Sequence, residues 1–325
     1  MKHFHSAYCL LFVTVALLFG RMAAAQEPNS SEEKRYAIVT VCVANMREEP
    51  RHAAEMATQC PLGMPLRVRE GRSGWYAVTT PEGYDCWVTA DSIVSMTKAE
   101  FNQWIKASKV IYLKNLGTVR SEPADDSVPV SDIAAGCVAV QESVNGSHVK
   151  IRFPDGRTGW ILRNDCADFE TWKRETKPTA ESVLKMAFEF MGVAYFWGGT
   201  TPKMFDCSGL TKHCFFMNGV IIPRNASQQA KSGLMIDIDN GLDRLEKGDL
   251  VFFGRNRVTH VGIYIENGLF IHESGRVRLD NLIPGAERHD RSLATSFVGA
   301  RRFIGTTQES GIIPIAEHPL YQVQP

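Results

Sequence analysis

Apolar and polar residues alternate in short stretches through the first half of the chain. The segments "LRVRE" (residues 66–70) and "WYAVTT" (75–80) are two examples, and proline and glycine separate one such stretch from the next. Alternation with a period of two, broken by turn residues, is typical of short antiparallel strands with one buried face. This half of the chain is therefore predicted to be built from small β-structures.

The alternating part of the sequence is also repeated. A shift of 73 residues without a gap superposes seven identities, namely Arg47 on Arg120, Glu49 on Glu122, Pro50 on Pro123, Gly63 on Gly136, Pro81 on Pro154, Gly83 on Gly156 and Trp87 on Trp160. Each copy is predicted to be a compact β-barrel of roughly 60 residues, within residues 26–100 and 101–172, and a third copy is not visible.

The pattern changes to helical spacing at about Thr171. The stretch "TAESVLKMAFEFMG" (179–192) brings five apolar residues onto one helical face: Val183, Leu184, Ala187, Phe188 and Met191. A second helix is predicted over "CSGLTKHCFFMNG" (207–219), with Asp206 as its N-cap and Asn218-Gly219 at its end. The segments "DLVFFG", "VTHVGIYIE" and "LFIHES" then read as strands. Helices followed by antiparallel strands predict an α+β domain over residues 173–305, and residues 306–325 are interpreted as a tail or an edge segment.

The first 25 residues are interpreted as a secretory signal peptide. Lys2 is followed by an apolar run from Cys9 to Phe19, and Ala23-Ala24-Ala25 suits a cleavage site. A membrane anchor is the alternative, but the run is short for a span. The chain is therefore expected to be exported, either to the periplasm or out of the cell, with no integral membrane segment after the signal is removed.

Charge and cysteine content narrow the possible functions. Without Lys2 and Arg21 the chain carries 34 basic and 36 acidic side chains, a net charge of −2, with no basic block that would suggest nucleic acid as a partner. Seven cysteines follow the signal peptide, and this odd number leaves at least one thiol outside any intramolecular disulfide. Because no Cys/His spacing resembles a metal site, neither a metal nor an organic cofactor is expected. The oligomeric state is open, with a monomer favoured.

Cys207 lies at the predicted start of a helix. There, free backbone N–H groups and the positive end of the helix dipole stabilise a thiolate, so its pKa is expected to be lowered. His260 and His272 lie on two neighbouring predicted strands and supply a base and a residue that orients it. From spacing alone, a buried unreactive or disulfide-bonded cysteine and two structural histidines remain possible.

The turn between these two strands decides whether the histidines meet. A two-residue Asn267-Gly268 turn would place His272 opposite Ile263 and the two rings on opposite faces of the sheet. A three-residue loop, residues 266–268, places His272 opposite Gly262, within diagonal reach of His260. The three-residue loop is therefore predicted.

Six motifs occur in one order: "YFWGG" (195–199), "FDCSGL" (205–210), "IPRNASQQ" (222–229), "KGDLVFFG" (247–254), "THVGIYI" (259–265) and "FIHES" (270–274). Over residues 175–305 this resembles the NlpC family of papain-like cysteine endopeptidases, which cut bacterial cell-wall peptides. The resemblance implies Cys207 as nucleophile, His260 as general base, His272 as the residue that orients it, and Tyr195 at the oxyanion site. The repeated copies resemble bacterial SH3-like domains, so the expected fold is two small SH3-like β-barrels followed by a papain-like α+β catalytic domain.

This domain order resembles γ-D-glutamyl-L-diamino-acid endopeptidases of the dipeptidyl-peptidase VI type. They act on peptidoglycan stem peptides and recognise a free N-terminal L-alanine, and the resemblance implies that Asp206 and Ser208 hold the amine while Trp197 walls the pocket. Helix capping is the alternative role for Asp206 and Ser208, and a core position is the alternative for Trp197.

Two residues of the first repeat copy are candidates for the same amine pocket. Glu55 and Tyr84 fall on Val128 and Arg157 of the second copy, so these positions differ in chemical type between the copies. A carboxylate and a phenol are suited to bind an ammonium group. A solvated surface position is the alternative for Glu55. An amidase or acyltransferase with the same Cys–His pair and a non-catalytic wall-binding protein remain alternative functions.

Overall fold

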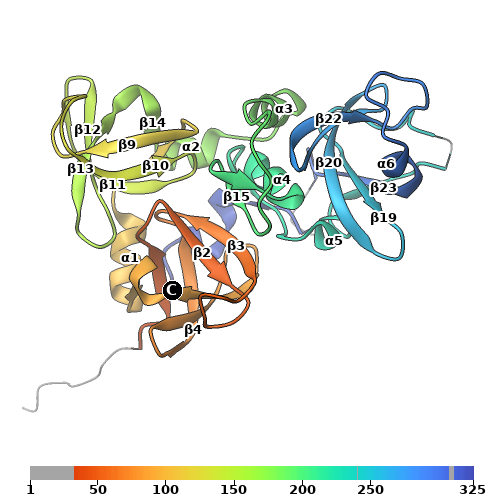
Figure 1. The fold of residues 1–325 in the computed structure, drawn as a ribbon. Helices are drawn as coiled ribbons and strands as arrows, with labels where there is room; N and C mark the ends of the chain where they lie inside the picture. Colours follow the sequence, from red (N-terminus) through yellow and green to blue (C-terminus); the bar gives the residue numbers. More distant parts are fainter. Residues whose placement is uncertain (1–32, 240, 307–310) are drawn as a thin grey trace, which may run out of the picture. The chain divides into compact units, whose positions relative to one another are not determined.

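The computed structural model describes residues 33–239, 241–306 and 311–325 (Figure 1). The predicted signal peptide, residues 1–25, lies outside the described residues. Among the described residues, no helix combines the length and the apolar character that crossing a membrane would require.

The first β-unit is a seven-stranded antiparallel sheet in the order β3-β2-β6-β5-β4-β1-β7. Its strands are β1 (Tyr36–Val39), β2 (Val43–Arg47), β3 (Met56–Pro61), β4 (Pro65–Arg72), β5 (Trp75–Thr79), β6 (Asp85–Thr89) and β7 (Ile93–Met96).

The second β-unit has the same order with every strand number raised by seven, β10-β9-β13-β12-β11-β8-β14. Its strands are β8 (Lys109–Tyr112), β9 (Leu116–Arg120), β10 (Pro129–Ala134), β11 (Val138–Asn145), β12 (His148–Arg152), β13 (Thr158–Leu162) and β14 (Cys166–Asp168). The repeat in the sequence is therefore a repeat of topology.

Local contacts repeat along with the topology. The Arg47 guanidinium donates to the Ala54 carbonyl oxygen at 3.0 Å, and Arg120 donates to the equivalent Ser127 oxygen at 2.6 Å. A short helix follows each unit: α1 (Lys98–Lys106), which begins with a Thr97–Glu100 capping box, and α2 (Phe169–Glu175), which is capped by Asp168.

The catalytic region is a six-stranded antiparallel sheet in the order β18-β23-β19-β20-β21-β22, preceded by helices α3 and α4 (Figure 1). Its helices are α3 (Ala180–Phe188), α4 (Cys207–Phe216), α5 (Ala226–Gln229) and α6 (Arg291–Ser296). Its strands are β15 (Thr200–Thr201), β16 (Met204–Phe205), β17 (Val220–Ile221), β18 (Leu234–Ile236), β19 (Leu250–Gly254), β20 (Val258–Glu266), β21 (Leu269–Ser274), β22 (Arg276–Asn281), β23 (Phe297–Arg302) and β24 (Ile313–Pro314). Helices before an antiparallel sheet confirm the α+β prediction.

The predicted apolar face of helix α3 is correct only in part. Val183, Leu184 and Ala187 are buried, but Phe188 and Met191 are 41% and 44% exposed. The helix ends at Phe188 because Thr179 caps its start and Glu189 is its C-cap, so Met191 no longer follows the helical period. Phe190 is buried instead.

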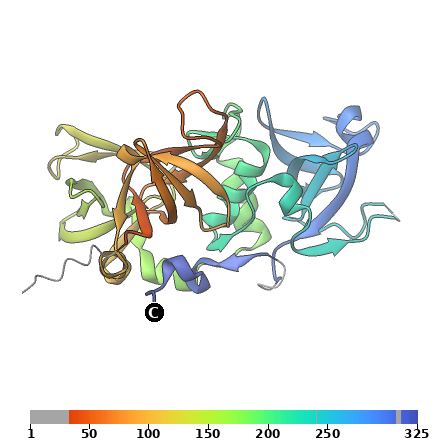
Figure 2. The same ribbon diagram turned by 90° about the horizontal axis from the view of Figure 1, so that it is seen from below.

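The C-terminal segment is packed, in contrast to the loose tail that was expected (Figure 2). Strand β24 pairs with β17, and the Pro81 carbonyl oxygen lies 2.8 Å from His318 Nε2. Leu320 and Tyr321 are buried. The segment lacks a sequence pattern because it consists of a two-residue strand and two 3-10 turns, which are too short to have a period.

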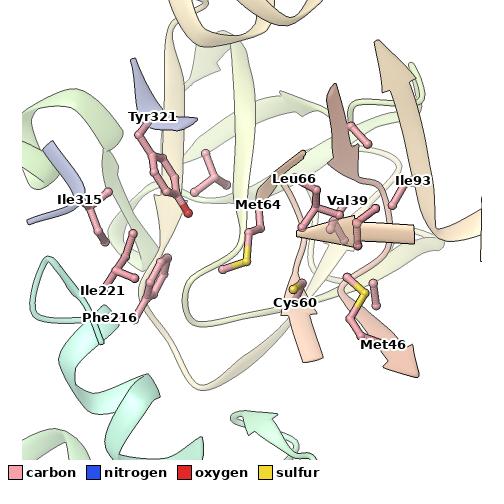
Figure 3. Packing of buried hydrophobic residues seen from close by; sticks show 14 of the residues in the cluster. Val39, Met46, Cys60, Met64, Leu66, Ile93, Phe216, Ile221, Ile315 and Tyr321 are labelled. Carbon is pink, nitrogen blue, oxygen red and sulfur yellow. The ribbon is translucent and has the colours of Figure 1, made fainter. Parts of the chain in front are cut away.

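One hydrophobic core joins distant parts of the chain (Figure 3). It contains Met64 and Leu66 of the first β-unit, Phe216 of helix α4, and Ile315 and Tyr321 of the C-terminal segment. Buried apolar surface is the main stabilising term of a fold, so these parts stabilise one another. A separate core fills the space between helix α4 and the six-stranded sheet.

Candidate active site

Cys207 is the first residue of helix α4, as predicted. Asp206 caps this helix by accepting a hydrogen bond from the Gly209 amide at 2.7 Å. Glycine is required at 209 because a Cβ there would lie 1.9 Å from the Gly199 carbonyl oxygen. The start of the helix is thereby held against the "YFWGG" segment.

The prediction that the pKa of Cys207 is lowered is wrong. Burial, together with the charge of Asp206, raises the pKa of Cys207 to about 12, although the amides of Val261 and Ser208 and the charge of Arg224 act against this. Removal of the thiolate from water therefore outweighs the helix terminus. Because Val261 follows His260 on β20, the Cys207 thiol lies against the strand that carries the expected base.

The two histidines meet, as predicted. His272 lies opposite Gly262, and His260 Nε2 is 2.6 Å from His272 Nδ1, with the ring centroids 4.9 Å apart and the rings inclined by 79°. The engagement of Nε2 leaves Nδ1 of His260 as the nitrogen available to a thiol. Burial, followed by the charges of His272 and Arg278, lowers the pKa of His260 to about 3. At neutral pH the resting site therefore holds a thiol and a neutral imidazole.

The loop that produces this register differs from the predicted one. Glu266 pairs with Leu269 across a two-residue turn, in which Asn267 and Gly268 have φ values of 49° and 77°. The register then shifts between Tyr264 and Glu266, so Ile265 forms a bulge. Bulge and turn together give the same register as a three-residue loop, because one unpaired residue changes the parity of every pair beyond it.

Asp280 completes a chain of hydrogen bonds that the sequence reasoning missed. Its Oδ2 atom lies 2.8 Å from His272 Nε2 and 2.8 Å from Arg278 Nη2. Burial opposes ionisation, but the hydrogen bond from His272 and the charge of Arg278 hold the pKa of Asp280 below its usual value. The signal was the alternation of "RVRLDN", which directs Arg278 and Asp280 to the face of His272 after the turn at Gly275.

Replacement of Asp280 by asparagine is expected to lower kcat about 10- to 100-fold with little change in KM, because His272 then loses the acceptor that fixes its tautomer and orientation. Steady-state kinetics over pH 5–9 measures this effect. Asp290→Asn is the matched control, since Asp290 also faces Arg278, at 3.6 Å, without a hydrogen bond to His272. Equal losses in both variants would contradict a positioning role for Asp280.

Asp206 is the centre of a buried polar network. Its carboxylate accepts hydrogen bonds from the Gly198 amide at 3.0 Å, the Gly209 amide and the Ser208 hydroxyl at 3.1 Å. Arg224, which is 2% exposed, binds both oxygens at 2.5 and 3.2 Å and also donates to Ser208 at 3.0 Å. Asp206 is therefore both the helix cap and the partner of a buried arginine.

A cavity of about 480 Å³ opens beside Cys207. Seven of the predicted site residues line it: Glu55, Tyr84, Tyr195, Trp197, Asp206, Cys207 and Ser208. His260 and His272 lie behind this lining, whereas Trp197 is 59% exposed and so belongs to the cavity wall and not to the core. The structure thus brings residues of the first β-unit and of the catalytic region to one site.

Two ties hold the first β-unit against the catalytic region at this cavity. Gln59 accepts hydrogen bonds from the Thr200 amide at 3.2 Å and the Thr201 hydroxyl at 2.9 Å. Lys212 of helix α4 forms a buried ion pair with Glu82 at 3.0 Å. These contacts fix the relative positions of the cavity walls.

Glu48 is a second cavity residue that the sequence reasoning missed. The Tyr84 hydroxyl donates to Glu48 Oε1 at 3.2 Å, and Glu55 lines the cavity beside this pair. The Glu48 amide donates to the Glu55 carbonyl oxygen at 3.1 Å, which explains how two residues seven positions apart share one wall. Comparison of the repeat copies at position 48 would have paired this glutamate with Ser121.

Two further titratable groups lie close to the thiol. Burial, followed by the charges of Cys207 and Asp206, raises the pKa of Tyr195, so its hydroxyl remains a hydrogen-bond donor at neutral pH. Burial and the charge of Asp206 raise the pKa of Glu273 to about 8, and within the described residues neither of its carboxyl oxygens has a hydrogen-bond partner. Among these residues, no group of three or more His, Cys, Asp or Glu side chains is arranged to hold a metal ion.

Comparison with known proteins agrees with this geometry. Residues 192–292 match the NlpC/P60 family, and residues 46–93 match the bacterial dipeptidyl-peptidase SH3 domain. The chain belongs to the NlpC/P60 family. It is a cysteine peptidase with an SH3-type N-terminal domain.

Relatives of this NlpC/P60 protein share its length as well as its domains. A γ-D-glutamyl-L-lysine dipeptidyl-peptidase of Bacillus cereus is 27% identical over 267 residues, which are 78% of this chain and 77% of the relative. Dipeptidyl-peptidase 6 of Lysinibacillus sphaericus is 27% identical over 272 residues, 80% of this chain and 96% of the relative. The crystal structure of an NlpC/P60 family protein from Bacillus cereus aligns with a TM-score of 0.71 at 22% identity, over 83% of this chain and 99% of that one, and so shares the fold.

Proposed function

We propose that this NlpC/P60 protein hydrolyses the γ-D-glutamyl-L-diamino-acid bond of peptidoglycan-derived peptides that carry a free N-terminal L-alanine. The observation that supports this most is the cavity beside Cys207, whose far wall comes from the first β-unit and carries two glutamates. The names of the two relatives above, a γ-D-glutamyl-L-lysine dipeptidyl-peptidase and a dipeptidyl-peptidase, support the same substrate class.

The proposed domain organisation is a signal peptide over residues 1–25, SH3-like barrels over 26–100 and 101–172, and a papain-like catalytic domain over 173–305. The shared strand order of the two β-units supports the second barrel. Export to the periplasm or the cell exterior follows from the signal peptide and from a cell-wall substrate.

Recognition of a free amine is proposed to depend on uncompensated carboxylates. The charge of Asp206 is already paired with Arg224. Glu48 accepts only one neutral hydrogen bond, from Tyr84, and Glu55 is exposed at the cavity. These two glutamates therefore give the cavity its negative charge, and a substrate ammonium between them and Ser208 would gain charge-assisted hydrogen bonds.

The proposed chemistry begins with the neutral Cys207–His260 pair. As the Cys207 sulfur attacks the γ-carbonyl carbon of D-glutamate, His260 accepts the thiol proton through Nδ1. The oxyanion is held by the Cys207 amide and the Tyr195 hydroxyl. His260 then donates its proton to the leaving amine, and a water molecule hydrolyses the thioester to release the dipeptide and the thiol.

The defining experiment is mass spectrometry of products from L-Ala-γ-D-Glu-L-diaminopimelate and the corresponding L-lysine peptide. The proposal expects L-Ala-D-Glu and a fragment that begins with the diamino acid. An amidase or acyltransferase would leave this bond intact and release or transfer another group. A wall-binding protein would retain peptidoglycan without producing any fragment.

An N-acetylated substrate is expected to be cleaved on the order of 10²-fold more slowly in kcat/KM than the free amine, because it leaves buried carboxylates without a partner. Glu48→Gln should shrink this ratio to below about tenfold by weakening only the free-amine substrate. Glu49→Gln is the matched control, since Glu49 pairs with Arg51 on the surface and does not line the cavity. Equal rates on both substrates would contradict the amine pocket while leaving the peptidase assignment intact.

A further inference from the structure

Two buried thiols from different β-units lie in contact. Cys42 directly precedes strand β2 and Cys137 directly precedes strand β11, and they are 3% and 1% exposed. The Cys137 Sγ atom lies 3.5 Å from the Cys42 carbonyl oxygen, and the two thiols are hydrogen-bonded to each other. All seven cysteines of the described residues are present as thiols in this structure.

The backbone around the two thiols is fixed by hydrogen bonds that cross between the units. The Leu62 amide donates to the Cys42 oxygen at 3.1 Å, and the Val138 amide donates to the Leu62 oxygen at 2.9 Å. A Cβ at Gly63 would lie 2.0 Å from the Val138 oxygen, so the two chains approach as closely as backbones permit. The folded chain therefore holds the two sulfur atoms near each other.

Neither cysteine is a remnant of the repeat. Under the shift of 73 residues, Cys42 falls on Asn115 and Cys137 falls on Met64. Each cysteine thus occurs only in the copy where it faces the other one. This complementary placement distinguishes them from Cys60 and Cys86, which are both buried in the first β-unit, without a hydrogen bond between them in the described structure.

We infer that Cys42 and Cys137 form a disulfide bond that links the two β-units of the exported protein. The inference rests on the predicted export, since an oxidising compartment allows disulfides to persist, and it does not depend on the proposed substrate. Two such adjacent thiols in a reducing cytosol would remain as they are here.

The oxidation proceeds by thiol–disulfide exchange with a disulfide-bearing oxidant, such as glutathione disulfide or a disulfide oxidoreductase. One cysteine thiolate attacks the oxidant disulfide and releases one oxidant thiol, and the second cysteine attacks the resulting mixed disulfide and releases the other. Two electrons pass from the cysteines to the oxidant. Burial opposes it, but hydrogen bonds from the Cys42 thiol and nearby amides lower the pKa of Cys137, while the hydrogen bond with Cys137 raises that of Cys42, so Cys137 attacks first. The exchange takes place before the units close over the thiols.

The test uses the chain from Gln26 with Cys207→Ala, so that the active-site thiol cannot exchange, produced by export into an oxidising compartment. Six cysteines remain in this chain, and four are expected to react with a thiol reagent in denaturant. Non-reducing peptide mapping should contain one linked pair, Cys42 with Cys137. Six reactive thiols, or a bridge that involves any other cysteine, would overturn the inference.

Thermal unfolding provides a second measurement. A bridge that closes a loop of this length is expected to make Tm fall by about 5–10 °C on reduction. Cys42→Ser and Cys137→Ser should each abolish this dependence on reductant. Cys60→Ser and Cys86→Ser are the matched controls and should retain it, because both residues are equally buried but lie outside the pair.

Discussion

Cys207→Ala is expected to abolish peptide hydrolysis, with a loss of about 10⁴-fold or more in kcat, while the protein remains folded. The sulfur atom is the only nucleophile at the start of helix α4, and alanine occupies the same small buried site. His260→Ala should cause a loss of similar size, since removal of the base leaves a thiol whose pKa is about 12. Product formation from a γ-D-glutamyl peptide, measured by mass spectrometry, checks both results.

Cys214→Ser is the matched control for this nucleophile. Cys214 lies two turns further along the same helix, is fully buried, and faces the core between the helix and the sheet. Its replacement should reduce stability and leave kcat almost unchanged. Near-normal turnover by purified Cys207→Ala, or a complete loss in Cys214→Ser with a normal melting curve, would end the assignment of Cys207 as the nucleophile.

Arg224→Met is expected to destabilise the protein by about 3–5 kcal/mol, the largest effect on stability that we predict for a residue that forms no part of the proposed chemistry. The Arg224 guanidinium is 2% exposed and binds both carboxylate oxygens of Asp206. Its loss leaves a charge buried at the cap of the helix that carries Cys207. Urea unfolding followed by circular dichroism measures the change in the free energy of unfolding.

The double variant Arg224→Met with Asp206→Asn separates the buried charge from other causes. Removal of both charges should restore most of the lost stability, because the remaining amide still accepts a hydrogen bond at the helix cap. A double variant as unstable as the single one would show that Arg224 acts through packing and not through its pairing with Asp206.

The elements of this fold were predictable where the period was long or repeated. The 73-residue repeat predicted two similar β-units, and the identical strand order confirms that they share one topology. Helix α4 was predictable because Asp206 and Gly219 mark its two ends. The packing of the last 15 residues was not, since contacts such as that of His318 with Pro81 join positions 237 residues apart.

The site was predictable as a set of residues but not as an electrostatic environment. Motif order indicated Cys207, His260 and His272, and alternation along the strands gave their register. The pKa of Cys207 depends on how completely the surrounding segments exclude water, which a helix terminus alone does not reveal. Glu48 and Asp280 were missed because each reaches its partner from another strand, and a single sequence carries no record of that contact.

The core that joins the first β-unit, helix α4 and the C-terminal segment also constrains how this protein evolves (Figure 3). Recombination usually exchanges modules that keep their own cores, yet here a transplanted catalytic region would lose the partners of Phe216 and one wall of its own cavity. The three parts must therefore be inherited as a unit, and a change of substrate is more accessible through single substitutions at the cavity wall than through the exchange of an SH3-type domain.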